Sequence, residues 1–103
     1  MIKEITQSEF DDMDRSRPML VEFYSKNCGP CKMLSFVLKE IDKNMPEFLI
    51  CQIDFDANME LKERLGVTGF PTMIFFKDSR EVLRMEGLQQ KPAIVKAIES
   101  LLH

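Results

Sequence analysis

Two cysteines three residues apart, Cys28 and Cys31, are the residues whose type and spacing could carry out chemistry. They lie in the segment 27–32, where an apolar run gives way to a helical pattern. Residues three apart on the first turn of a helix are neighbours, so the two sulfurs can form a disulfide. The amides and dipole of a helix N-terminus favour an anion, which should make the first thiol more acidic. The spacing therefore predicts a reversible dithiol/disulfide pair in which Cys28 attacks and Cys31 resolves.

Gly29 and Pro30 form the turn between the cysteines, and Pro30 fits a first helical turn because it has no amide hydrogen. The alternative for such a pair is half of a zinc site, which needs four ligands. The other soft ligands are Cys51, inside an apolar run, and the terminal His103. We therefore expect no metal site. Cys51 is expected to be an inert buried residue, with a regulatory thiol as the alternative.

The composition fits one small globular domain spanning residues 1–103. With 45% hydrophobic residues the chain can form an ordinary core without disulfide staples. The net charge of −3, without a basic stripe, argues against a nucleic acid or an anionic membrane as partner. No apolar run reaches the roughly 18 residues of a membrane span. An odd number of cysteines and an N-terminus without an apolar signal segment lead us to expect a cytoplasmic protein.

The positions of the apolar runs predict the elements that must hold the cysteine pair. Nearly continuous apolar runs bounded by turns are typical of strands that are covered on both faces. The expected strands are 2–6, 19–24, 48–54, 73–76 and 81–85, and the expected helices are 8–14, 28–44, 59–65 and one from residue 91 onward. The order β-α-β-α-β-α-β-β-α predicts a three-layer α/β/α sandwich with parallel pairing at its start and an antiparallel hairpin late in the chain.

Local signals mark several of these boundaries. Ser8 and Asp11 have the spacing of a capping box for the first helix, and Asn58 can cap the third. Gly66 can supply the left-handed stop of that third helix. The polar segment 77–80 has hairpin length. The apolar stripe expected for the last helix comprises Ile94, Val95, Ile98, Leu101 and Leu102.

Over essentially its whole length the chain resembles the thioredoxin family. The resemblance is carried by the segment 21–24 (Val-Glu-Phe-Tyr) leading to Cys-Gly-Pro-Cys-Lys, by Gly-Phe-Pro-Thr at 69–72, and by Gly87 before the last helix. A Cys-X-X-Cys motif alone is a weak signal, whereas this combination is a specific one. The resemblance implies a mixed five-stranded sheet flanked by four helices. It also implies an electron carrier that reduces disulfides in target proteins and is recharged by a thioredoxin reductase, driven by NADPH or ferredoxin.

The resemblance also implies roles for single residues. The thiolate of Cys28 attacks a target disulfide and Cys31 resolves the mixed disulfide, so the redox-active disulfide is the only cofactor expected. Pro71 is expected to be cis and to face the cysteines, whereas a trans turn proline is the general alternative. The backbone of Phe70 is expected to pair with the target chain. Asn27 and Gly87 complete the expected substrate-binding surface, and a monomer is the expected state.

Three positions depart from the family pattern. Asn27 replaces the usual Trp, which should alter partner choice more than chemistry. Glu22 replaces the usual buried Asp, and Gln52 replaces the lysine that is often its neighbour. Burial in an apolar strand would raise the pKa of Glu22 and suit it to accept the proton of Cys31; the alternative is an exposed residue on an alternating strand.

Two other functions remain open from the sequence. The first is an adaptor domain of the same fold that docks protein partners and whose cysteines are incidental; the intact Cys-Gly-Pro-Cys segment argues against it. The second is an oxidant or isomerase of the same fold. Gly29 and Pro30 between the cysteines favour the reductant, and a measured reduction potential would separate the two directions.

Overall fold

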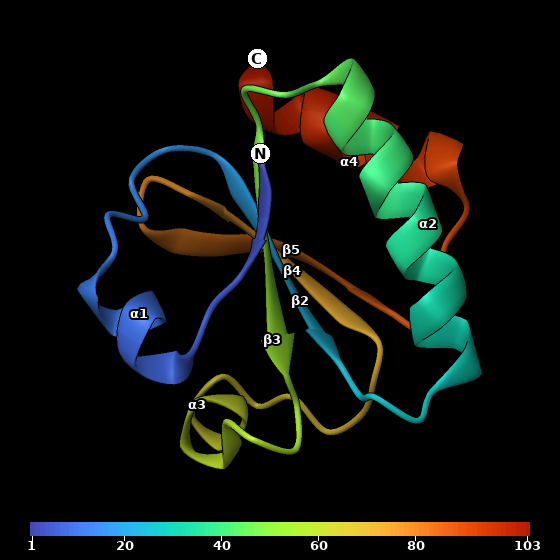
Figure 1. The fold of residues 1–103 in the computed structure, drawn as a ribbon. Coiled ribbons are helices and arrows are strands. Elements are labelled where there is room, and N and C mark those ends of the chain that lie inside the picture. Colours follow the sequence, from blue (N-terminus) through green and yellow to red (C-terminus); the bar gives the residue numbers. More distant parts are fainter.

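The computed structural model describes residues 1–103, and its elements follow the predicted order. Strands and helices alternate along the chain until two consecutive strands form a hairpin, after which a helix closes the fold (Figure 1). The elements are β1 (Ile2–Glu4), α1 (Gln7–Asp12), β2 (Met19–Tyr24), α2 (Gly29–Asn44), β3 (Leu49–Asp54), α3 (Met59–Arg64), β4 (Thr72–Lys77), β5 (Arg80–Glu86) and α4 (Lys91–Leu102). None of the helices is long and apolar enough to cross a membrane.

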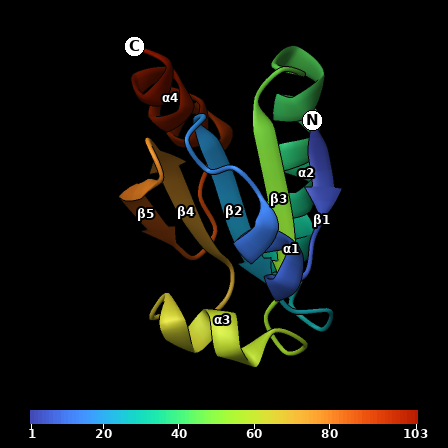
Figure 2. The ribbon, with the colours of Figure 1, turned by 90° about the vertical axis from the view of Figure 1, so that its left-hand side faces the viewer.

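The five strands form one mixed sheet in the order β1-β3-β2-β4-β5 (Figure 2). The pairs β1–β3 and β3–β2 are parallel, whereas β4 runs antiparallel to both β2 and β5. Helices α2 and α4 cover one face of the sheet, and α1 and α3 cover the other (Figure 1). The predicted three-layer sandwich with its antiparallel hairpin is therefore confirmed.

Each face of the sheet carries its own apolar cluster, because side chains alternate between the faces along a strand. In β2, Val21 and Phe23 belong to the cluster under α1 and α3. Leu20 belongs to the cluster under α2 and α4. By the same alternation Glu22 lies on the face covered by α2 and α4, where it is the polar exception in an apolar strand.

The cap of α1 is one place where the sequence prediction was wrong. Thr6, not Ser8, is the N-cap, and it forms the reciprocal capping box with Glu9 instead of Asp11. The helix consequently spans Gln7–Asp12 instead of 8–14. The physical reason is the position of Phe10, which is buried under the sheet and fixes the register of this short helix.

Two smaller predictions also needed correction. Asn58 is the N-cap residue of α3, but its side chain makes no capping bond; its Nδ2 donates to the carbonyl of Asp54 and its Oδ1 accepts from the amide of Gln7. Leu102 is 50% exposed because it lies off the face of α4 that packs on the sheet, which its neighbour Leu101 occupies in the last turn. The left-handed Gly66 and the hairpin turn, with positive φ at Asp78 and Ser79, are confirmed.

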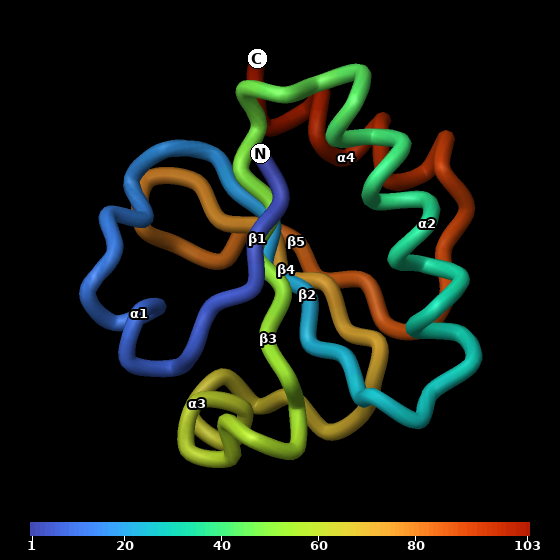
Figure 3. Tube along the Cα trace, in the orientation of Figure 1, coloured from blue at the N-terminus to red at the C-terminus, as the bar shows by residue number.

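The topology brings two distant loops to the same end of the sheet. Phe23, near the end of β2, is paired with Thr72, the first residue of β4. The loop that follows β2 and the loop that precedes β4 therefore meet, as the chain trace shows at its lower end (Figure 3). The first loop leads into the cysteine pair at the start of α2, and the second carries Pro71.

Candidate active site

Cys28 and Cys31 lie at the junction of the β2–α2 loop with α2, and their sulfurs are bonded to each other. Their Cα atoms are 5.2 Å apart, within the range that disulfides span. Cys28 is the N-cap of α2, and its Sγ accepts a hydrogen bond of 3.1 Å from the amide of Cys31. That amide and the helix dipole both favour negative charge on this sulfur when the disulfide is reduced.

The two cysteines are buried, but the residues next to them in the chain are exposed to solvent. Cys28 and Cys31 are only 6% and 4% exposed, whereas Gly29 and Pro30 between them are exposed. Asn27 and Lys32 flank the pair and are also exposed. The turn at the start of α2 and the residues that flank it therefore form the exposed side of the disulfide.

The loop before β4 supplies the second side of the site. The peptide bond between Phe70 and Pro71 is cis, as predicted. The amide of Gly87, a left-handed residue just after β5, donates to the carbonyl of Pro71 at 2.8 Å and ties these two segments together. The ring of Phe70 is 42% exposed and packs edge-on against Phe55, with ring centroids 5.1 Å apart. The backbone amide and carbonyl of Phe70 make no hydrogen bond within the chain.

Glu22 is completely buried, as predicted from the apolar strand around it. Its register partner on β3 is Gln52, whose Nε2 donates to Glu22 Oε1 at 3.0 Å. Its other carboxylate oxygen, Oε2, has no partner. Burial raises the pKa of Glu22 from its ordinary value of 4.5 to about 7, and the hydrogen bond from Gln52 opposes this only in part. The carboxyl therefore exchanges its proton near neutral pH.

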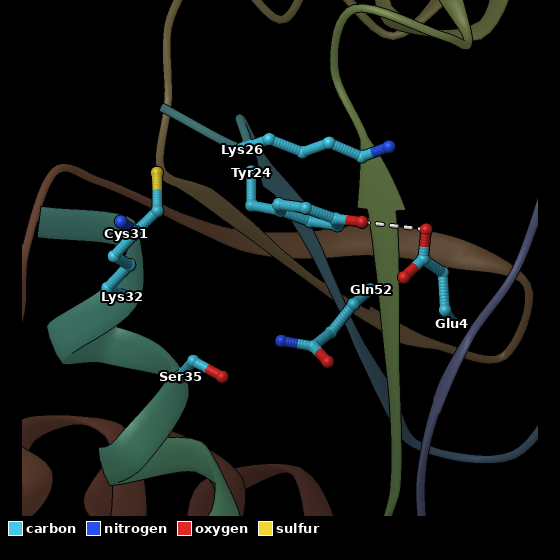
Figure 4. Close-up of a pocket in the computed structure, with 7 residues that line it drawn as sticks. All are labelled: Glu4, Tyr24, Lys26, Cys31, Lys32, Ser35 and Gln52. Atoms are coloured by element: carbon cyan, nitrogen blue, oxygen red, sulfur yellow. Dashed lines mark hydrogen bonds between the residues drawn. The ribbon is translucent and has the colours of Figure 1, made fainter. Parts of the chain in front are cut away.

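A polar pocket lies between the start of α2 and the β1 edge of the sheet. Its volume is about 260 Å³. The residues that line it are Glu4, Tyr24, Lys26, Cys31, Lys32, Ser35 and Gln52 (Figure 4). The pocket brings Cys31 and Gln52, the partner of Glu22, into the wall of one polar space. The sequence prediction did not include Glu4, Tyr24 or Ser35, because only the pairing of β1 with β3 places the first of them there.

The Thioredoxin family model matches residues 1–100 of the chain. The chain belongs to the thioredoxin family. It is 41% identical over 98 residues to the thioredoxin of Chlamydia muridarum, an alignment that covers 95% of this chain and 96% of that protein. It is 32% identical over 102 residues to a Mycobacterium tuberculosis thioredoxin, covering 96% and 88% of the two chains. A mutant thioredoxin of Halobacterium salinarum has a matching structure with a TM-score of 0.90 and 33% identity, covering 99% and 91%.

Family membership and the bonded cysteine pair together establish the activity. The chain is a thiol–disulfide oxidoreductase of the thioredoxin family, which reduces protein disulfides by reversible dithiol/disulfide exchange. The structure of chloroplastic thioredoxin z, at 23% identity and a TM-score of 0.87, shares the fold. The fold and activity predicted from the sequence are thus confirmed.

The third cysteine lies apart from this thioredoxin-type site. Cys51 is the neighbour of Val21 in the sheet register and is completely buried in the cluster under α1 and α3. Burial raises the pKa of its thiol to about 11, so it stays protonated at neutral pH. No group of three or more His, Cys, Asp or Glu side chains is arranged to hold a metal ion.

Proposed function

We propose that Cys28 is the attacking thiol of this oxidoreductase and Cys31 the resolving thiol. The observation that carries the assignment is the position of Cys28 at the N-cap, where its sulfur accepts the amide hydrogen of Cys31. That donor stabilises a thiolate at Cys28 and has no counterpart at Cys31. The Cys28 thiolate breaks the target disulfide and forms a mixed disulfide with one of its sulfurs. Cys31 then displaces that sulfur, which leaves as a thiolate.

Glu22 is proposed as the proton acceptor of the resolving thiol. Cys31 must lose its proton before it can attack Cys28, and a base whose pKa lies near the working pH is suited to this transfer. The pKa of about 7 at Glu22 meets that condition. The position of Cys31 and Gln52 in the wall of one pocket supports the role, because Gln52 bonds directly to the Glu22 carboxylate.

The proposed target-binding surface consists of Asn27, Phe70, Pro71 and Gly87. The unpaired amide and carbonyl of Phe70 support this surface, because an extended target segment can hydrogen-bond to them as an added strand does. The exposed ring of Phe70 adds an apolar contact to this surface. Asn27, which directly precedes Cys28, offers an exposed side-chain amide.

The proposed partners are disulfide-containing proteins and a separate thioredoxin reductase that restores the dithiol, driven by NADPH or ferredoxin. One relative supports the reductase: a Mycobacterium leprae protein named bifunctional thioredoxin reductase/thioredoxin, of which this chain covers 22% at 32% identity. The active disulfide is the only redox group proposed, without a metal or organic cofactor. The chain is proposed to act as a monomer in the cytoplasm, away from nucleic acid and membranes.

Trapping of the mixed disulfide tests the roles of the two cysteines. Cys31→Ser lacks the resolving thiol and is expected to accumulate covalent adducts with a model disulfide protein, which reducing agent releases. Cys28→Ser is the matched control, because it keeps Cys31 and loses the attacking thiol. Adducts that form with Cys28→Ser as readily as with Cys31→Ser would reverse or remove the assigned roles.

A further inference from the structure

Three polar side chains form a row across the sheet on the face covered by α2 and α4. Glu4 of β1 is the register partner of Gln52 of β3, and Gln52 is the register partner of Glu22 of β2. Beyond Glu22 the row ends at Met73 of β4, a buried apolar residue. The row therefore leads in one direction only, from a buried carboxyl to an exposed one at the edge of the sheet.

Hydrogen bonds orient both ends of this row. Gln52 Nε2 donates to Glu22 Oε1 at 3.0 Å, which leaves Glu22 Oε2 buried and unpartnered. At the other end the Tyr24 hydroxyl donates to Glu4 Oε2 at 2.6 Å (Figure 4). Burial and the nearby Glu4 carboxylate raise the pKa of Tyr24 above its ordinary value, so this hydroxyl remains a donor at neutral pH. The second oxygen of Glu4 is free to accept a proton.

The pocket described above covers the outer part of the gap between the two carboxyls, from Gln52 to Glu4. Adjacent strands are about 4.8 Å apart, so two strand spacings separate Glu4 from Glu22 by roughly 10 Å, which is too far for direct transfer. The pocket of about 260 Å³ is lined mainly by polar side chains and has room for several waters at about 30 Å³ each. Gln52 lines this pocket and touches Glu22, while Glu4 lines it at the solvent side.

We propose that Glu4, held by Tyr24, is the group through which the proton of Glu22 passes to solvent, by way of waters in this pocket. The inference rests on the proposed role of Glu22. In the resolving step Cys31–SH gives its proton to the Glu22 carboxylate, and the resulting thiolate attacks Cys28 Sγ. The bond from Cys28 to the target sulfur breaks, and the target leaves as a thiolate. In the oxidised protein Glu22 exchanges this proton with solvent, and Glu4 is the group that receives it.

The other ionisable groups in the pocket wall or next to it are less suited to this role. They are Lys26 in the β2–α2 loop, Lys32 and the Cys31 thiol on α2, and Asp54 on β3. A lysine ammonium group is a donor without a lone pair, so it does not serve as a proton acceptor. Asp54 is paired with Lys26 at 3.8 Å, accepts the amide of Asp56 and does not line the pocket. Glu4 is the one carboxylate in the pocket wall.

The proton-exchange rate of Glu22 tests the proposal without any turnover. Nuclear magnetic resonance of the oxidised protein, labelled at the Glu side-chain carboxyl carbons, reports that rate as exchange broadening near the midpoint of the Glu22 titration. Glu4→Gln is expected to slow the exchange several-fold, and Glu4→Asp is expected to keep most of the rate. Tyr24→Phe, which keeps the carboxylate but not its positioning bond, is expected to fall between them.

Glu99→Gln is the matched control, since Glu99 is an exposed carboxylate on α4 without an ion pair or side-chain hydrogen bond. In Glu99→Gln the proton of Glu22 should exchange at the wild-type rate. Added imidazole should bring Glu4→Gln back toward the wild-type rate, because a small diffusible base replaces the missing acceptor. An unchanged rate in Glu4→Gln, an equal loss in Glu99→Gln, or a slow rate that imidazole does not change would overturn the proposal. The cysteine roles would be unaffected by these results, because adduct trapping measures them separately.

Discussion

The burial of Glu22 should make the stability of the protein depend on pH, and Glu22→Gln should remove most of that dependence. Glutamine has nearly the size of glutamate, and its carbonyl can still accept the hydrogen bond from Gln52. It cannot ionise. The difference in unfolding free energy between variant and wild type therefore isolates the cost of charging this one carboxyl inside the fold.

The sign follows from where the proton is held. In the unfolded chain Glu22 ionises near its ordinary pKa of 4.5, whereas in the fold it keeps its proton up to about pH 7. Between these values the folded state binds more protons, so the free energy of unfolding falls as the pH rises. The contribution of the neutral carboxyl is complete below pH 4.5 and is lost once the pH has passed about 7. At about 1.4 kcal/mol per tenfold change in ionisation constant, the loss is about 3 kcal/mol.

Urea unfolding of the oxidised proteins across a pH series measures this effect. The unfolding free energy of Glu22→Gln, relative to that of the wild type, should rise by about 3 kcal/mol between roughly pH 4 and pH 9. Most of this rise should occur between pH 5 and 7. At low pH both proteins carry a buried polar atom without a partner at the position of Oε2, so its cost cancels in the difference between their unfolding free energies. Glu99→Gln should show no such trend. A gap between Glu22→Gln and wild type that stays constant across the series would refute the burial argument.

Three further predictions concern the chemistry and the fold. The rate of mixed-disulfide resolution, followed by stopped-flow, should fall in the wild type as the pH drops below about 7, because Glu22 becomes protonated. In Glu22→Gln the rate should be lower and should depend on pH differently. Identical pH profiles for the two proteins would remove Glu22 from this step. In the reduced native protein Cys28 should be alkylated readily, whereas the completely buried Cys51 should react only in denaturant; rapid labelling of Cys51 in the native protein would contradict its burial. Thr6→Ala should lower the unfolding free energy by about 1 kcal/mol and Ser8→Ala by no more than about 0.5 kcal/mol. A larger loss in Ser8→Ala than in Thr6→Ala would show that Ser8 is the cap.

The sequence predicted the layers of the fold well because its strands are strongly patterned. Met19–Tyr24 and Thr72–Lys77 are almost entirely buried runs, and such runs admit few readings besides central strands. The start of α1 was harder to predict. Thr6 with Glu9 and Ser8 with Asp11 are overlapping patterns; Glu9 fits the capping box better than Asp11, but the hydroxyl of either Thr6 or Ser8 can cap a helix. The packing of Phe10 against the sheet decides, and that contact is set by the tertiary structure.

The site shows the same division between local and long-range information. The cysteine pair and the burial of Glu22 follow from neighbours in the sequence, and the cis bond at Pro71 followed from the family motif. The role of Glu4 could not be predicted, because it depends on the register between β1 and β3. A shift of that register by one residue would turn the Glu4 side chain to the opposite face of the sheet. Pairings between distant strands therefore carry the part of the site that local patterns do not.

The residue at position 52 explains why the buried carboxyl titrates near neutral pH. An ammonium group beside Glu22 would favour its charged form and lower its pKa, leaving a stable ion pair that holds no proton at pH 7. Gln52 orients the carboxylate but adds no charge, so the cost of burial dominates and the pKa rises to about 7. The protein thereby gives up stability at neutral pH and gains a base that both accepts and releases protons there. Such a base needs a route to solvent. The row of Gln52 and Glu4 supplies one toward β1, whereas on the β4 side the neighbour of Glu22 is the apolar Met73.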